Sequence, residues 1–180
     1  METVFSGNPW TTSFTEDSFG NIWIGTYRNG TFCFHKNQTP FQKSMSGKNI
    51  ECMSTDHSGN YWIGSLNGEV CVLDSTQKQI MGKTIFPNDM IHTIYGQESS
   101  NKVWVGTMRG LYEAWIESNK QIVYQKTPGI NIPSIRSIVQ DSCFLWIASY
   151  NNGVTLYNYS TQQSVVTYKT DSEVLPLPSN

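Results

Sequence analysis

The chain has 180 residues and a nearly balanced charge, with 12 basic and 14 acidic side chains. This length suits one domain with a substantial core, and the absence of a basic excess or of a run of like charges argues against nucleic-acid binding through a basic patch. No apolar stretch in the sequence approaches the roughly 20 residues that a membrane-spanning helix needs.

One tryptophan-centred phrase occurs four times along the chain, at residues 21–25, 60–64, 102–106 and 144–148. In the first copy Ile22 and Ile24 alternate with Trp23, and this two-residue period predicts a β-strand. A second glycine follows each copy, at Gly30, Gly68, Gly110 and Gly153. Because the copies recur about every 40 residues, each is predicted to be one structural unit of a repeat protein.

Each unit is predicted to contain four strands. The tryptophan strand is preceded by an extended run at residues 12–16, 50–55, 91–95 and 135–140, and is followed by one at 31–34, 69–73, 111–115 and 154–157. A weaker closing run is predicted at residues 78–81, 121–125 and 164–168. Asp17 and Gly20, like Asp56 and Gly59, are typical of the tight turns that join antiparallel strands.

Four-stranded antiparallel units in tandem predict an all-β fold, a β-propeller with four blades at residues 10–46, 47–86, 87–130 and 131–172. No stretch has the sustained 3.6-residue period of a helical solenoid, and the WD-repeat and kelch signatures are absent. Residues 173–180 look like a linker toward a further blade, so we expect a fragment of a larger propeller array. Four blades could close alone, remain an open arc, or self-associate through exposed blade edges.

The repeated phrase resembles the two-component regulator propeller repeat, at residues 12–17 and 23–26 in the first copy and at residues 135–141 in the fourth. This resemblance implies the periplasmic sensor region of a membrane-bound, often hybrid, bacterial two-component system that controls the use of complex carbohydrates. It implies a non-enzymatic part of an inner-membrane protein whose membrane span and histidine kinase lie outside this chain. Signal transduction would then begin with ligand binding.

Recognition residues are expected at one end of the blades. Because strand directions alternate, the turns between second and third strands lie at the same end as the linkers between blades. Aromatic faces beside Arg, Asn and Asp suit a carbohydrate or oligosaccharide, and arginine also suits an anionic sugar. The predicted ligand-binding residues are Tyr27, Arg28, Asn67, Asn88, Asp89, Arg109, Tyr150 and Asn151.

Other interpretations of these residues stay open. Asn or Arg before glycine can simply shape a turn. A propeller lyase or hydrolase would require Glu51, His92 and Arg136 to converge at the axis, and a protein-interaction scaffold would need no small ligand. The histidines lack metal-site spacing, Asp17, Asp56 and Asp141 are expected to form turns, and no metal or cofactor is predicted.

The cysteines and tryptophans are expected in the interior. Cys33 and Cys71 both follow the second glycine by three residues, so we expect them at equivalent places in successive blades, too far apart for a disulfide. The four cysteines are therefore predicted to be mostly buried thiols. The repeated tryptophans are predicted to be core residues that pack against the next sheet.

Overall fold

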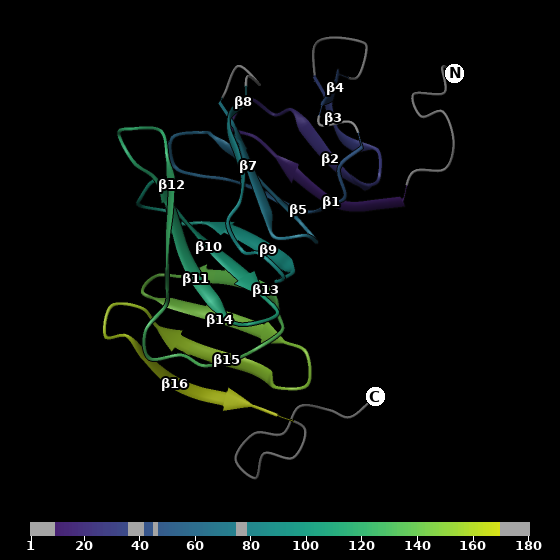
Figure 1. The fold of residues 1–180 in the computed structure, drawn as a ribbon. Coiled ribbons are helices and arrows are strands. Elements are labelled where there is room, and N and C mark those ends of the chain that lie inside the picture. The colour runs from purple at the N-terminus through teal and green to yellow at the C-terminus, as the bar shows by residue number, and fades with distance from the viewer. Residues whose placement is uncertain (1–9, 36–41, 45–46, 75–78, 170–180) are drawn as a thin grey trace.

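The computed structural model describes residues 10–35, 42–44, 47–74 and 79–169, and these form 16 strands in four sheets of four antiparallel strands (Figure 1). The first sheet contains β1 (Trp10–Glu16), β2 (Ile22–Tyr27), β3 (Gly30–Phe34) and β4 (Gln42–Ser44). The second contains β5 (Ile50–Thr55), β6 (Tyr61–Ser65), β7 (Glu69–Leu73) and β8 (Gln79–Thr84). The third contains β9 (Ile91–Gly96), β10 (Lys102–Thr107), β11 (Leu111–Ile116) and β12 (Ile122–Lys126). The fourth contains β13 (Ile135–Asp141), β14 (Phe144–Ser149), β15 (Gly153–Asn158) and β16 (Gln163–Tyr168).

The predicted all-β propeller is confirmed, because every sheet pairs its strands in the order in which they occur along the chain. Each sheet falls within one predicted blade range, and the boundaries themselves remain predictions. Residue 78 of the predicted closing run and the predicted linker at 173–180 lie outside the described residues. Described residues include no helix with the length and apolar character of a membrane span.

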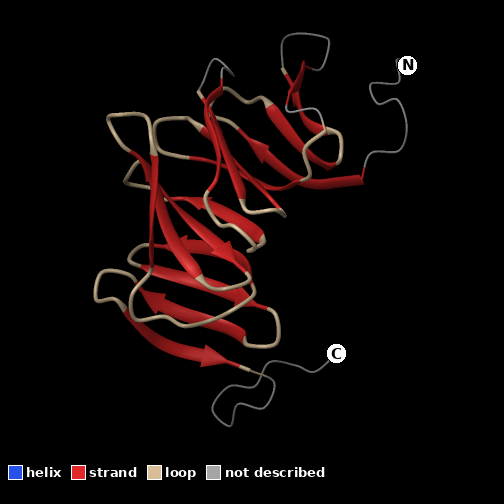
Figure 2. Ribbon diagram, viewed as in Figure 1, coloured by secondary structure: helices blue, strands red, loops and turns tan. Residues whose placement is uncertain are grey.

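The four sheets follow one another along an open arc of strands and connecting loops (Figure 2). The first strands of neighbouring sheets pack together in succession, β1 on β5, β5 on β9 and β9 on β13. The first and fourth sheets show no comparable packing on each other within the described ranges. Of the three arrangements that the sequence left open, the single chain therefore adopts the open arc.

The core lies in layers between neighbouring blades, and the repeated tryptophans are its largest members. Trp23, Trp62 and Trp104 are 1%, 0% and 3% exposed. They pack in clusters with apolar residues of the following blade, as Trp23 does with Tyr61 and Ile63. Trp146 belongs to the last described blade and is 38% exposed. The core role is confirmed for the first three tryptophans. The fourth is partly exposed because no following blade packs on it in the described residues.

The turn aspartates connect the hairpin to the core. One oxygen of Asp17 accepts from the backbone N–H of Asn21 at 2.8 Å, and the other accepts from the indole Nε1–H of Trp23 at 3.2 Å. Asp56 repeats the arrangement with Asn60 at 3.0 Å and Trp62 at 2.9 Å. The predicted turn-forming role of both aspartates is confirmed, and each also satisfies the only polar atom of a buried tryptophan side chain.

The glycine after each tryptophan makes room for the next blade. A Cβ added to Gly25, Gly64 or Gly106 would lie 2.9, 2.8 or 2.5 Å from the Cγ2 atom of an isoleucine that begins the next blade, respectively Ile50, Ile91 and Ile135. The fourth copy has Ala148, and no further blade follows it in the described residues. The repeated glycine is therefore explained by the close approach of adjacent blades.

The expected equivalence of Cys33 and Cys71 is wrong. Cys33 pairs with Trp23 in the β2–β3 register, whereas Cys71 pairs with Ile63 in the β6–β7 register. The second glycine follows Trp23 by seven residues but Trp62 by only six, so counting from the glycine shifts the strand by one residue and reverses the face. Both side chains consequently enter the same cluster between the first and second blades. Cys33, Cys52 and Cys71 are buried thiols, and Cys143 is half-buried.

Candidate ligand-binding site

The linker face is defined as the end of the blades that carries the second turns, 27–30, 65–69, 107–111 and 149–153, and the linkers between blades. Backbone hydrogen bonds cross this end: Met108 N donates to Met90 O at 3.1 Å, Ser134 N to Met108 O at 2.8 Å, and Tyr150 N to Ser134 O at 2.9 Å. Turns and linkers therefore do share one face, as predicted.

Three side chains from successive inner strands meet beside this face. The Oε1 atom of Glu51 on β5 lies 3.9 Å from Nδ1 of His92 on β9, and Nη1 of Arg136 on β13 lies 3.1 Å from the same Nδ1 atom. The guanidinium carbon of Arg136 is also 5.6 Å from the ring centroid of Tyr150. Glu51, His92 and Arg136 thus converge, as the enzymatic alternative requires.

His92 is a buried, neutral acceptor for Arg136. A guanidinium can only donate, so Nδ1 accepts and the imidazole proton belongs on Nε2. The His92 side chain is 5% exposed. Burial lowers the pKa of His92, and the positive charge of Arg136 lowers it further, against a smaller opposing effect of Asp89. For Glu51, burial raises the pKa while Arg136 opposes the rise. The cluster therefore orients Arg136 rather than exposing the histidine.

A second aromatic group lies at the start of the arc. The guanidinium carbon of Arg28 is 5.0 Å from the ring centroid of Tyr27, and Trp10 stacks on the same tyrosine with centroids 6.0 Å apart and planes 23° apart. Arg28 and Tyr27 were predicted as site residues, whereas Trp10 was missed. The strand register would have indicated Trp10, because Trp10 pairs directly with Tyr27 across β1 and β2.

Some predicted site residues have structural tasks. Arg28, Asn88 and Asn151 have φ angles of 72°, 60° and 64°. These left-handed conformations are typical of turn residues, so Asn88 and Asn151 shape the backbone where they lie. Asp89 is 5% exposed and lies beneath the face rather than on it. Arg109 and Tyr150 are exposed.

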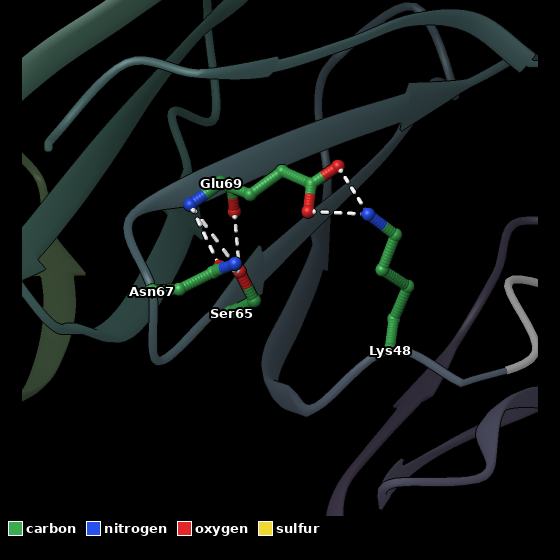
Figure 3. A network of polar contacts seen from close by, with 4 residues as sticks. All are labelled: Lys48, Ser65, Asn67 and Glu69. Atoms are coloured by element: carbon green, nitrogen blue, oxygen red, sulfur yellow. Dashed lines mark hydrogen bonds and ion pairs between the residues drawn. The ribbon is translucent and has the colours of Figure 1, made fainter.

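Asn67 is held within a polar network at the second blade (Figure 3). Its Oδ1 atom accepts from the Ser65 hydroxyl and from the backbone N–H of Glu69, the latter at 3.3 Å. Lys48, from the preceding linker, donates to both carboxylate oxygens of Glu69 at 2.9 and 2.7 Å. The oxygen of Asn67 is thus used to close the turn, and the charge of Glu69 is neutralised by Lys48.

The opposite end of the blades has a hollow of about 220 Å³ between the first turns of blades one and two, and Asp17, Phe19, Asp56 and His57 are among its lining residues. The carboxylates of Asp17 and Asp56 already accept hydrogen bonds from their own turns and tryptophans. No group of three or more His, Cys, Asp or Glu side chains in the described residues is placed to hold a metal ion.

Several solved structures have the same fold as this chain and belong to longer proteins. The extracellular domain of a hybrid two-component system from B. thetaiotaomicron is 24% identical, with a TM-score of 0.74, over 94% of this chain and 24% of its own. An auxiliary nutrient binding protein from Bacteroides thetaiotaomicron is 14% identical, with a TM-score of 0.71, over 92% of this chain and 48% of its own. A virginiamycin B lyase from Staphylococcus aureus is 15% identical, with a TM-score of 0.69, over 92% and 57%. This chain therefore spans about a quarter of the first of these proteins.

Sequence comparison identifies the repeat itself. No curated protein matches the chain. Residues 5–28, which include β1 and β2, match the family described as two component regulator propeller. This match confirms the resemblance to the two component regulator propeller family that the four repeated phrases indicate.

Proposed function

We propose that this chain is a non-catalytic, ligand-sensing propeller from the extracytoplasmic input region of a bacterial two-component regulator. The family match at residues 5–28 and the shared fold of the extracellular domain from B. thetaiotaomicron support this assignment. The ligand is a carbohydrate or a breakdown product of one, and it binds on the linker face. The auxiliary nutrient binding protein has the same fold, which is compatible with such a ligand.

The observation that carries the proposal is the pair of arginine-capped tyrosines on the linker face. Arg28 covers Tyr27 and Arg136 approaches the ring of Tyr150, which is 62% exposed. A sugar ring offers an apolar C–H face for stacking and hydroxyl groups for hydrogen bonds, so aromatic rings beside guanidinium groups match both properties. The two pairs lie on the first and fourth blades, so the linker face has a stacking point at each end of the arc.

Binding would become a signal through differential affinity. The inner strands of all four blades pack in succession, and backbone hydrogen bonds connect the linkers to the second turns. A ligand that contacts several blades stabilises one arrangement of them over others, and the population of that arrangement rises. The parts of the parent protein beyond this chain would then respond to the shifted population.

A glycan array tests this function directly. The chain is expected to bind a defined set of glycans, and Tyr150→Ala should weaken that binding at least tenfold, because it removes the stacking surface. Phe19→Ala is the matched control, since Phe19 is 67% exposed on the opposite end of the blades. Equal loss in both variants, or no glycan bound by the intact chain, would contradict the proposal.

The second candidate is a propeller lyase or hydrolase, because Glu51, His92 and Arg136 converge. The shared fold of the virginiamycin B lyase shows that this architecture can support an enzyme. Against catalysis, the Nδ1 atom of His92 is occupied by Arg136 and the ring is buried. Turnover of a bound glycan that is lost in His92→Ala would favour the enzyme over the sensor.

Self-association is the third element of the proposal. Phe14 on the first blade is 63% exposed, whereas the residues at its position in the later blades, Met53, Ile94 and Ile138, are 7%, 5% and 3% exposed. In the later blades this face is covered by the preceding blade, whereas in the first blade it is exposed. The fourth blade exposes the opposite face, where Trp146 lies. A second copy can join these two faces. A large apolar contact without any ligand would instead favour an interaction scaffold.

A further inference from the structure

All three arginines of the chain lie on the linker face. Arg28 occupies the turn between β2 and β3, Arg109 the turn between β10 and β11, and Arg136 is the second residue of β13, which begins at this end. All three are exposed. Arginine is elsewhere absent from the sequence, so the strongest anion-binding side chains are gathered at one end of the blades.

None of the three arginines forms an ion pair within the described part of the chain, where the pairs found are Lys48–Glu69, His92–Glu51 and Lys102–Glu113. Arg28 and Arg136 contact tyrosine rings instead. Stacking on a ring uses the flat face of a guanidinium and leaves its N–H edge pointing outward. Arg136 gives one N–H to His92, and four of its five donors remain for a ligand.

Among the described residues, no carboxylate on or beside this face forms an ion pair with an arginine. Glu69 is paired with Lys48 at 2.7 Å, Asp89 is buried, and Glu51 is half-buried with its Oε1 atom 3.9 Å from Nδ1 of His92. Acidic residues are common at the opposite end, where the first and third turns of the blades carry Asp17, Asp56, Glu98, Glu117 and Asp141. The arginines are therefore gathered on the linker face although the whole chain has a net charge of −2.

We propose that the ligand of the linker face is an acidic oligosaccharide whose carboxylate or sulfate groups bind Arg28, Arg109 and Arg136. This inference rests on the proposed carbohydrate-sensing function and specifies its ligand class. Arg136 is the main anchor, because His92 and Tyr150 hold its guanidinium in place before ligand arrives. Planar oxyanions accept two parallel N–H bonds from one guanidinium, so a pre-oriented arginine favours them over neutral hydroxyls.

Calorimetric titration with matched probes tests the charge requirement. Trigalacturonate supplies carboxylates, neocarratetraose sulfate supplies sulfates on a neutral sugar chain, and fully methyl-esterified trigalacturonate keeps the sugar rings but removes the charge. At least one acidic probe should bind at least tenfold more tightly than the ester, and raising the salt concentration should weaken that binding. The relative affinities for the two acidic probes distinguish carboxylate from sulfate.

Substitutions of single arginines test where the acidic probe binds. Arg136→Met and, independently, Arg109→Met should each weaken binding of the acidic probe by tenfold or more, and should weaken binding of the methyl ester by a smaller factor. Lys120→Met is the control, because Lys120 is an exposed cation in the turn between β11 and β12 at the opposite end. Circular dichroism confirms that each variant is folded, and the Arg109 variant keeps the test decisive if the Arg136 variant is not.

The outcomes separate the inference from the function on which it rests. Equal affinity for the acid and its ester, with other glycans bound on the array, overturns the acidic ligand and leaves the sensing function standing. Acidic probes that bind equally well to all arginine variants also overturn it. Failure of every array glycan and both acidic probes contradicts the ligand class and the proposed function together.

Discussion

Asp17 joins a turn, a tryptophan and the neighbouring blade through one carboxylate. Besides Asn21 and Trp23, it accepts from the hydroxyl of Tyr61 on β6 at 2.6 Å. Trp23 and Tyr61 are both 1% exposed and their rings lie 4.2 Å apart. The residue that the sequence identifies as a turn-former is therefore also a contact between the first two blades.

Removing this carboxylate should destabilise the fold. Asp17→Ala leaves the buried Trp23 and Tyr61 donors without an acceptor, and the free energy of unfolding should fall by roughly 2–4 kcal/mol. Asp141→Ala is the matched control at the same place in the fourth blade, where the side chain is exposed, and it should change stability by less than about 0.5 kcal/mol. Urea unfolding of both variants measures the difference, and comparable losses would contradict the role of Asp17.

The ionisation of Asp17 also predicts a pH dependence. Burial raises its pKa, but hydrogen bonds from Tyr61, Asn21 and Trp23 lower it more strongly, to about 2 from 3.8. A carboxyl with a depressed pKa in the folded state stabilises the fold above its unfolded pKa, and this stabilisation is lost as the pH falls from about 4 to about 2. Thermal melts should show a smaller loss over this range for Asp17→Asn than for the parent chain. An identical loss in both proteins would show that other groups cause it.

The glycine after each tryptophan is a property of the blade interface rather than of the strand. Gly64→Ala would place a Cβ 2.8 Å from Cys52 Sγ and 2.8 Å from Ile91 Cγ2, so the second and third blades would have to separate. The expected cost is roughly 1–3 kcal/mol, as for other overpacked cores. Ala148→Gly, at the same position of the fourth copy, should cost about 1 kcal/mol or less. Denaturant midpoints compare the two, and a neutral Gly64→Ala would refute the close-packing explanation.

The repeated phrase was sufficient to predict strands, sheets and the tryptophan layers, because each copy repeats the same local periodicity. It did not predict the Cys71 side of its strand, since the second glycine lies one residue closer to the tryptophan in that copy and a shift of one residue reverses the face of each side chain counted from it. Nor did it show that Glu51, His92 and Arg136 would touch, because that contact depends on how adjacent inner strands align. Their shared position, one residue after Ile50, Ile91 and Ile135, was nevertheless visible in the sequence.

The sequence predicted that the candidate ligand residues lie at one end of the blades. The role of each residue could be assigned only from the structure. Arg28, Arg109 and Tyr150 are exposed or stacked on that face. Asn67 closes its own turn and Asp89 is buried, and neither fact can be read from residue type. The hydrogen bonds of turns and the burial of linkers depend on tertiary packing, which a single sequence does not specify.

The open arc determines how the whole molecule should behave in solution. Phe14 at one end and Trp146 at the other are exposed, although residues at their positions are buried between the other blades. Light scattering should therefore give a molar mass that rises with concentration toward that of a dimer. Phe14→Glu should keep the chain monomeric, because a charged side chain cannot be buried in this layer. A monomer at every concentration, identical to the variant, would contradict self-association through these faces.

The most direct measurement is hydrogen–deuterium exchange of the chain with and without the tightest-binding array glycan. Binding on the linker face predicts slower exchange in the second turns and linkers, at residues 27–30, 107–111, 133–136 and 149–153. Protection should be absent from the first turns at residues 17–21, 56–60 and 97–101. Protection confined to those first turns would contradict the proposed site and would place the ligand at the opposite end of the blades.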